Sequence, residues 1–188
     1  MTTSLIKGLT RSTAEVHHST HSISAQEFIT IYDELFPRIF TYVRYRVDDL
    51  STADDLTSDI FERALKFFES YQPSIAPFSA WIFAIARNEV NKHLRTQATE
   101  PCMDFERIQD QPAVDPTPEE LLMEIESHQE VLEAIKTLSE RERDLLGQKF
   151  SSRLTNRHIA EITGISESNV GVIVYRTLQK LRKMLTAV

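Results

Sequence analysis

The chain has 188 residues, of which 41% are hydrophobic and 4 are glycine, a composition that fits one large or two small domains and favours helices. No apolar run approaches the roughly 20 residues of a membrane span, and the first residues lack an apolar signal core. The single cysteine, Cys102, excludes an internal disulfide. We therefore expect a cytoplasmic protein. The net charge of −7 argues against nucleic acid as a partner only if it is spread evenly along the chain.

Residues 1–24 are rich in Ser and Thr and show little apolar periodicity, which predicts a mobile tail. His17 and His21 in this stretch have the i, i+4 spacing of a metal pair, with His18 between them. That spacing alone does not complete a coordination sphere, so we expect no metal and no other cofactor.

Residues 25–96 are predicted to form an N-terminal helical domain. Apolar residues recur at helical spacing from Phe28, which predicts a core helix that Pro37 would kink. Thr52 with Asp55 resembles a capping box at the start of a second helix. A third helix is expected from Phe78 to Leu94 with Trp81 in the core, after a loop with two prolines.

The polar faces of the second and third helices differ in charge. The second helix is acidic on the side opposite its apolar face, and the default interpretation of such a face is contact with solvent. The third helix follows an aromatic-rich loop and presents amides and cations, a combination suited to single-stranded nucleic acid. The residues on this face are Arg87, Asn88, Asn91, Lys92 and Arg95.

Residues 97–120 have the acids and prolines of a linker, and residues 121–188 are predicted to form a C-terminal domain. Residues 97–133 contain 11 acidic residues and one basic residue, a net of −10. Residues 134–188 contain 5 acidic and 10 basic residues, a net of +5. The acidity therefore lies mostly in the middle of the chain, and the basic C-terminal part suits binding to phosphates.

The C-terminal part contains the pattern of a helix-turn-helix. Thr155 is expected to cap the first helix, Gly164 to end it, and Ser166 to cap the second. The second helix has an apolar stripe of Val170, Val174, Leu178, Leu181 and Leu185, and its other side is cationic, as in an element that enters the DNA major groove. The alternative is a helical hairpin that only packs.

Four motifs resemble bacterial sigma factors of the extracytoplasmic-function group. They are ADDLTSDIFERA at 53–64, FSAWIFAIARN at 78–88, LSERERDLL at 138–146 and IAEITGIS at 159–166. The resemblance implies an all-α fold of two small helical domains and a protein that binds the RNA polymerase core enzyme and promoter DNA, without being an enzyme. It also implies an anti-sigma factor as a partner.

The resemblance also implies roles for individual residues. The polymerase-binding residues would be Asp55, Ser58, Asp59 and Glu62. The residues contacting the promoter −10 element would be Tyr71, Asn88, Asn91, Lys92 and Arg95, with Asn88 near a pocket for a flipped base. The residues contacting the −35 element would be Ser168, Asn169, Val172, Tyr175, Arg176 and Lys180.

Departures from the family pattern leave other interpretations to weigh. Ser58 stands where Gln is common, and Gly171, Val172 and Ile173 stand where Lys, Arg or Ser are common, which removes donors for phosphates and base edges. An ordinary helix-turn-helix regulator that acts without polymerase is the main alternative. An enzyme using Asp54, Asp55 and Asp59 as metal ligands is a third, and no base or nucleophile is placed to join them.

Overall fold

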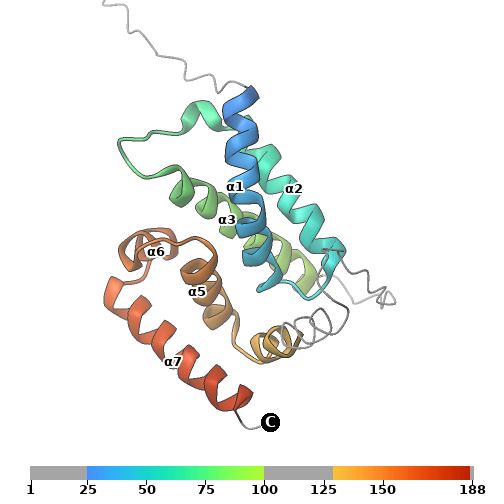
Figure 1. Ribbon diagram of the computed structural model, residues 1–188, viewed down its shortest axis with the longest axis vertical. Coiled ribbons are helices and arrows are strands. Elements are labelled where there is room, and N and C mark those ends of the chain that lie inside the picture. The colour runs from blue at the N-terminus through green and yellow to red at the C-terminus, as the bar shows by residue number, and fades with distance from the viewer. Residues whose placement is uncertain (1–24, 100–128, 187–188) are drawn as a thin grey trace, which may run out of the picture.

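The computed structural model describes residues 25–99 and 129–186, and the regular elements in these two ranges are all helical. The elements are α1 (Ala25–Arg44), α2 (Leu50–Lys66), the short 3-10 helix η1 (Phe68–Ser70), α3 (Phe78–Thr99), a helix over 129–136, α5 (Glu140–Ser151), α6 (Asn156–Thr163) and α7 (Glu167–Leu185). The all-α prediction is confirmed for this part of the chain. We call residues 25–99 the N-terminal module and residues 129–186 the C-terminal module; helices α1 to α3 lie beside α5 to α7 (Figure 1).

Helix α1 supplies one wall of the N-terminal core because its apolar side chains recur every three or four residues. Pro37 lies within α1, and the helix continues past it to Arg44. The buried face packs on α2 and α3, so the predicted core helix is confirmed. The buried apolar residues of α1 are Leu35, Ile39, Tyr42 and Val43.

Helix α2 begins earlier than predicted. Its N-cap is Asp49, whose carboxylate accepts hydrogen bonds from the backbone amide and the hydroxyl of Thr52, both at 2.7 Å. These bonds, the backbone one first, hold the pKa of Asp49 below its usual value. The predicted capping box of Thr52 with Asp55 is wrong, because a better acceptor stands three residues before Thr52 and places it inside the helix.

Helix α3 confirms the third predicted helix and extends it to Thr99. Gln97 to Thr99 are therefore helical, although the sequence suggested that the linker begins at Gln97. Trp81 differs from its prediction as a core residue: it is half-buried and packs at the edge of the core with other aromatic rings.

The predicted caps of the helix-turn-helix are confirmed. The hydroxyl of Thr155 accepts a hydrogen bond from the amide of His158, and that of Ser166 accepts one from the amide of Asn169, both at 3.3 Å. Gly164 ends α6 with φ of 73°, in the left-handed region that glycine adopts with little steric cost.

The buried stripe of α7 differs in part from the prediction. Val170, Val174 and Leu181 are buried as expected, and Thr177 joins them. Leu178 and Leu185 are each 39% exposed. The reason is the helical period: the spacing 170, 174, 177, 181 follows one face, and residue 178 is turned about 100° from residue 177.

The two modules pack against each other, α1 on α5 and α3 on α6. A single apolar cluster includes Tyr42 and Phe83 of the N-terminal module and Leu145 and Ile159 of the C-terminal module. A smaller cluster under α7 takes in Tyr45, the residue directly after α1. The contact between modules is thus part of the apolar core.

Several predictions concern segments outside the described residues: the tail with His17, His18 and His21, Cys102, and most of the acidic linker. Within the described ranges, no helix combines the length and apolar character that crossing a membrane requires.

Candidate functional site

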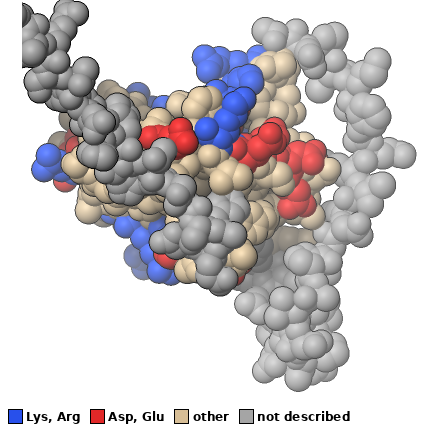
Figure 2. All heavy atoms as spheres, turned by 90° about the horizontal axis from the view of Figure 1, so that it is seen from above, with Lys and Arg blue, Asp and Glu red and all other residues tan. Residues whose placement is uncertain are grey.

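The acidic face of α2 is open to solvent. Asp55, Ser58, Asp59 and Glu62 are all exposed, while Leu56, Ile60 and Phe61 on the other side of the helix are buried. The structure therefore places the four predicted polymerase-binding residues on one accessible surface. On the face seen in Figure 2, acidic side chains lie directly beside basic ones.

A shallow hollow of about 320 Å³ separates the acidic face of α2 from α3. Within it, Arg63 pairs with Glu89 at 3.1 Å, which ties the two helices together. A surface with alternating charge signs suits a protein partner that itself carries both signs, because like charges placed opposite each other are unfavourable. The hollow is lined by Asp59, Glu62, Arg63, Lys66, Phe67, Glu89 and Lys92.

Four aromatic rings gather where η1 and the following loop meet the start of α3. Tyr71 lies 5.2 Å from Phe78 and 5.4 Å from Trp81, and Phe68 lies 5.9 Å from Phe78, measured between ring centroids. All four residues are half-buried, and burial raises the pKa of Tyr71. Rings that are held by one another and still reach the surface can receive unstacked bases. Of these four residues, only Tyr71 was predicted from the sequence to contact DNA.

The predicted polar face of α3 is accessible over most of its length. Asn88, Lys92 and Arg95 are exposed and follow one another at helical spacing, on a line leading away from the aromatic cluster. Asn91 is half-buried, and its carbonyl oxygen accepts a hydrogen bond of 2.9 Å from Arg46. Asn91 therefore positions an arginine in this structure, a role the sequence did not indicate.

Helix α7 presents most of its predicted DNA-reading residues to solvent. Ser168, Asn169, Val172, Tyr175 and Arg176 are exposed, Tyr175 at 64%. Lys180 differs, because its ammonium lies 3.3 Å from the carboxylate of Glu142.

The pairing of Lys180 with Glu142 joins α7 to the start of α5. Ser139 and Glu142 form a capping box at the N-terminus of α5, in which the amide of Ser139 donates to the Glu142 carboxylate at 2.8 Å. That hydrogen bond, with a smaller effect from Lys180, holds the pKa of Glu142 below its ordinary value. Lys180 thus helps to fix the helix-turn-helix to α5.

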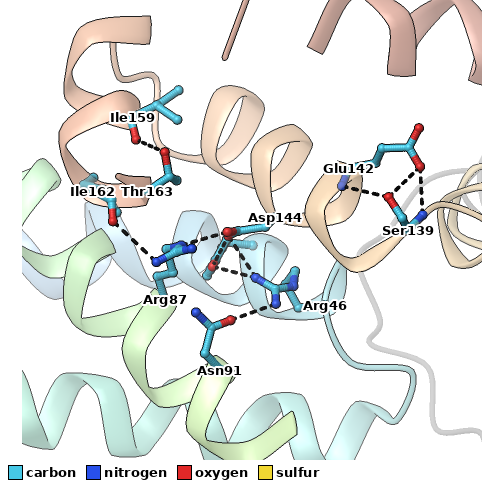
Figure 3. A network of polar contacts seen from close by, with 10 residues as sticks. Arg46, Arg87, Asn91, Ser139, Glu142, Asp144, Ile159, Ile162 and Thr163 are labelled. Atoms are coloured by element: carbon cyan, nitrogen blue, oxygen red, sulfur yellow. Dashed lines mark hydrogen bonds and ion pairs between the residues drawn. The ribbon is translucent and has the colours of Figure 1, made fainter. Parts of the chain in front are cut away.

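A buried ionic network joins the two modules (Figure 3). The Asp144 carboxylate on α5 lies 2.9 Å from a guanidinium nitrogen of Arg46, in the turn after α1, and 2.7 Å from Nε of Arg87 on α3. The hydroxyl of Tyr42 also donates to Asp144, at 2.8 Å, and burial, followed by the charge of Asp144, raises the pKa of that hydroxyl. Nothing in the local sequence distinguishes Asp144 from the nearby Glu140 and Glu142, so no sequence pattern indicates its role.

Two protein-family models match the chain: sigma-70 region 2 over residues 31–100 and sigma-70 region 4 over residues 134–183. Among curated relatives, the ECF RNA polymerase sigma factor BldN of Streptomyces coelicolor is 28% identical over 86% of this chain, which spans 61% of the length of BldN. The RNA polymerase sigma factor SigZ of Bacillus subtilis is 27% identical, with 82% of this chain and 85% of SigZ covered.

Two solved structures share the fold. The sigma factor RpoE of Bartonella quintana, in complex with the anti-sigma factor NepR, matches with a TM-score of 0.69 at 20% identity, covering 86% of this chain and 98% of that one. CnrH, in complex with the cytosolic domain of CnrY, matches with a TM-score of 0.61 at 18% identity, covering 87% of this chain and 90% of that one.

Proposed function

The chain belongs to the sigma-70 family, with region 2 in its N-terminal module and region 4 in its C-terminal module, and we propose that it acts as a sigma factor. It binds the RNA polymerase core enzyme, directs it to promoters and helps to open the DNA. The role is that of a regulatory subunit that catalyses no bond change itself. An anti-sigma factor is a further proposed partner. RpoE was solved in complex with the anti-sigma factor NepR, and CnrH in complex with the cytosolic domain of CnrY.

The observation that supports the proposal is that one chain carries two different surfaces whose side chains suit nucleic acid. The aromatic cluster beside Asn88 suits bases that have left the duplex, because ring faces stack on bases and an amide can bond to a base edge. Helix α7, second in its helix-turn-helix, suits the major groove of intact duplex. A protein with both surfaces can grip promoter DNA at one place and hold it open at another.

The parts of the chain then divide the work. The exposed acidic face of α2 docks on polymerase, the aromatic cluster with Asn88, Lys92 and Arg95 contacts the −10 element, and α7 contacts the −35 element. On α7, Arg176 is the exposed cation nearest the helix N-terminus. Lys180 reaches DNA only by leaving Glu142, so base recognition rests mainly on Asn169, Tyr175 and Arg176 with methyl contacts from Val172.

Transcription with purified components tests the proposal. The full chain, the core enzyme and fragmented genomic DNA should give transcripts whose start sites share −10 and −35 sequences, and omitting either protein should abolish them. Specific DNA binding by the chain alone, with no transcription directed to those sites in the presence of core enzyme, would instead favour a helix-turn-helix regulator that is not a polymerase subunit.

A further inference from the structure

Glu89 is a sheltered acidic side chain on α3, the helix whose polar face is proposed to contact opened DNA. Its side chain is 13% exposed, against 48% for Arg63 and 71% for Lys92. One carboxylate oxygen lies 3.1 Å from the Arg63 guanidinium on α2, and the other lies 4.0 Å from the ammonium of Lys92, three residues further along α3. Glu89 therefore has one partner on the helix proposed to bind polymerase and one that is proposed to bind DNA.

The two ion pairs of Glu89 differ in strength. Arg63 approaches closely, and its guanidinium also lies over the ring of Phe67, 5.5 Å from the ring centroid, which helps to hold it in place. The pair with Lys92 is longer, and its ammonium is mostly in water, where such a pair contributes little. Arg63 can therefore neutralise Glu89 by itself, and Lys92 can leave Glu89 at a small cost in free energy.

Glu89 would oppose DNA binding if no cation stayed beside it. A phosphate bound by Lys92 in its present position would lie within about 7 Å of the Glu89 carboxylate, because the ammonium is 4.0 Å from that carboxylate and a charged hydrogen bond adds about 2.8 Å. This separation is shorter than the Debye length of about 8 Å at physiological salt, so the repulsion is incompletely screened. Without Arg63, Glu89 would both retain Lys92 and repel the phosphate.

We infer that Arg63 is a positioning residue for the opened DNA strand: it neutralises Glu89 and so leaves Lys92 available to bind a phosphate of that strand. The inference rests on the proposed function, in which Lys92 contacts the −10 element. Arg63 acts from α2 through Glu89 and does not itself need to touch the strand. Because phosphate contacts carry no sequence information, Arg63 sets the strength of strand binding and not the base preference.

Neutralising the two members of the Arg63 and Glu89 pair should change strand binding in opposite directions. Arg63→Gln should weaken binding by about two- to fivefold, because Glu89 then retains Lys92. Glu89→Gln should strengthen binding by a similar factor, because Lys92 loses its competing partner. The double variant should bind as Glu89→Gln does, because Arg63 has no carboxylate to neutralise once Glu89 is replaced.

Fluorescence anisotropy of a labelled oligothymidylate of about 20 nucleotides, titrated with the full chain at low salt, measures these effects, since a phosphate contact does not depend on sequence. Lys66→Gln is the matched control, because it removes a cation from the same helix and the same hollow. The Lys66 ammonium lies 6.0 Å from the ring centroid of Phe67 and, among the described residues, pairs with no carboxylate. Its replacement should change the affinity by less than about twofold.

The salt dependence of binding distinguishes a lost phosphate contact from a disturbed fold. Each phosphate contact with a single strand adds about 0.7 to the slope of log affinity against log salt concentration. Lys92→Gln and Arg63→Gln should each lower this slope by up to about 0.7, and adding Glu89→Gln to Arg63→Gln should recover it. Helix content by circular dichroism should be the same in all variants.

The outcomes separate the role of Arg63 from the proposed function. Weaker binding in both single variants and in the double variant would overturn the inference, because the pair would then only tie α2 to α3. It would also be overturned by an unchanged salt slope in Arg63→Gln, by a Lys66 control that matches Arg63→Gln, or by an unmodified chain that does not bind the strand. The predicted order of affinities, together with no promoter-specific transcription in the presence of core enzyme, would support the role of Arg63 and overturn the proposed function.

Discussion

The two glycines of the helix-turn-helix should respond in opposite directions to the same substitution. Gly164 has φ of 73°, and a Cβ built on it meets nothing within 4 Å. Gly171 lies inside α7, where a Cβ would be 3.4 Å from the side-chain amide nitrogen of Asn156. At Gly164 there is space for a methyl group, but the backbone conformation is unfavourable for alanine. At Gly171 the backbone is helical and suits alanine, and the added methyl group would make an ordinary van der Waals contact.

The magnitudes follow from these two geometries. At Gly164, an L-residue in the left-handed region costs about 1–2 kcal/mol, and the smaller entropy of the unfolded alanine chain returns about 0.4–1 kcal/mol. Gly164→Ala should therefore destabilise by about 1 kcal/mol. Gly171→Ala should stabilise by about 0.5–1 kcal/mol, because alanine is the better helix former and the amide of Asn156 needs to move little.

Urea unfolding of the full chain, followed by circular dichroism, measures both effects in one experiment. The midpoints of the two variants should lie on opposite sides of the unmodified chain, with similar m-values, since neither change alters the surface exposed on unfolding. The reasoning is refuted if both variants shift in the same direction, because available space rather than backbone conformation would then decide the outcome.

Three further predictions concern function and pH. Asp55→Lys with Asp59→Lys should weaken binding to core enzyme while changing stability by less than about 0.5 kcal/mol, since both residues are exposed; unchanged affinity by titration would remove α2 from the polymerase interface. Arg176→Ala should cost about 1–3 kcal/mol on the preferred −35 duplex and less on random duplex in a binding assay, whereas equal losses would assign it to the phosphate backbone. Because folding lowers the pKa of Glu142, the ionised carboxylate stabilises the fold above its unfolded pKa of about 4.5, and this stabilisation is lost as pH falls through the folded pKa. The difference in unfolding free energy between the unmodified chain and Glu142→Gln should therefore shrink below about pH 4.5. A difference that stays constant when unfolding is measured across this pH range would contradict the prediction.

Local sequence determined the helices of this protein and most of their ends. Apolar spacing located α1, α2, α3 and α7, and the caps at Thr155 and Ser166 and the turn at Gly164 were all predictable, because helix period and capping depend on residues a few positions apart. The exposed face of α2 followed from the same periodicity. Where a prediction failed at this level, as at Thr52, a competing cap stood three residues away.

Tertiary structure alone decided how the modules meet. Tyr42 and Asp144 are 102 positions apart in sequence, and their contact depends on the packing of α1 against α5. Within the N-terminal module, Asn91 accepts a hydrogen bond from Arg46, and Lys180 pairs with Glu142 of α5. The partners of these two predicted DNA-binding side chains thus come from distant positions in the sequence. Helical periodicity predicts which side of a helix is buried, but the residues that pack on that side come from distant segments of the chain. Which charges pair across such a contact depends on geometry that only the assembled fold creates.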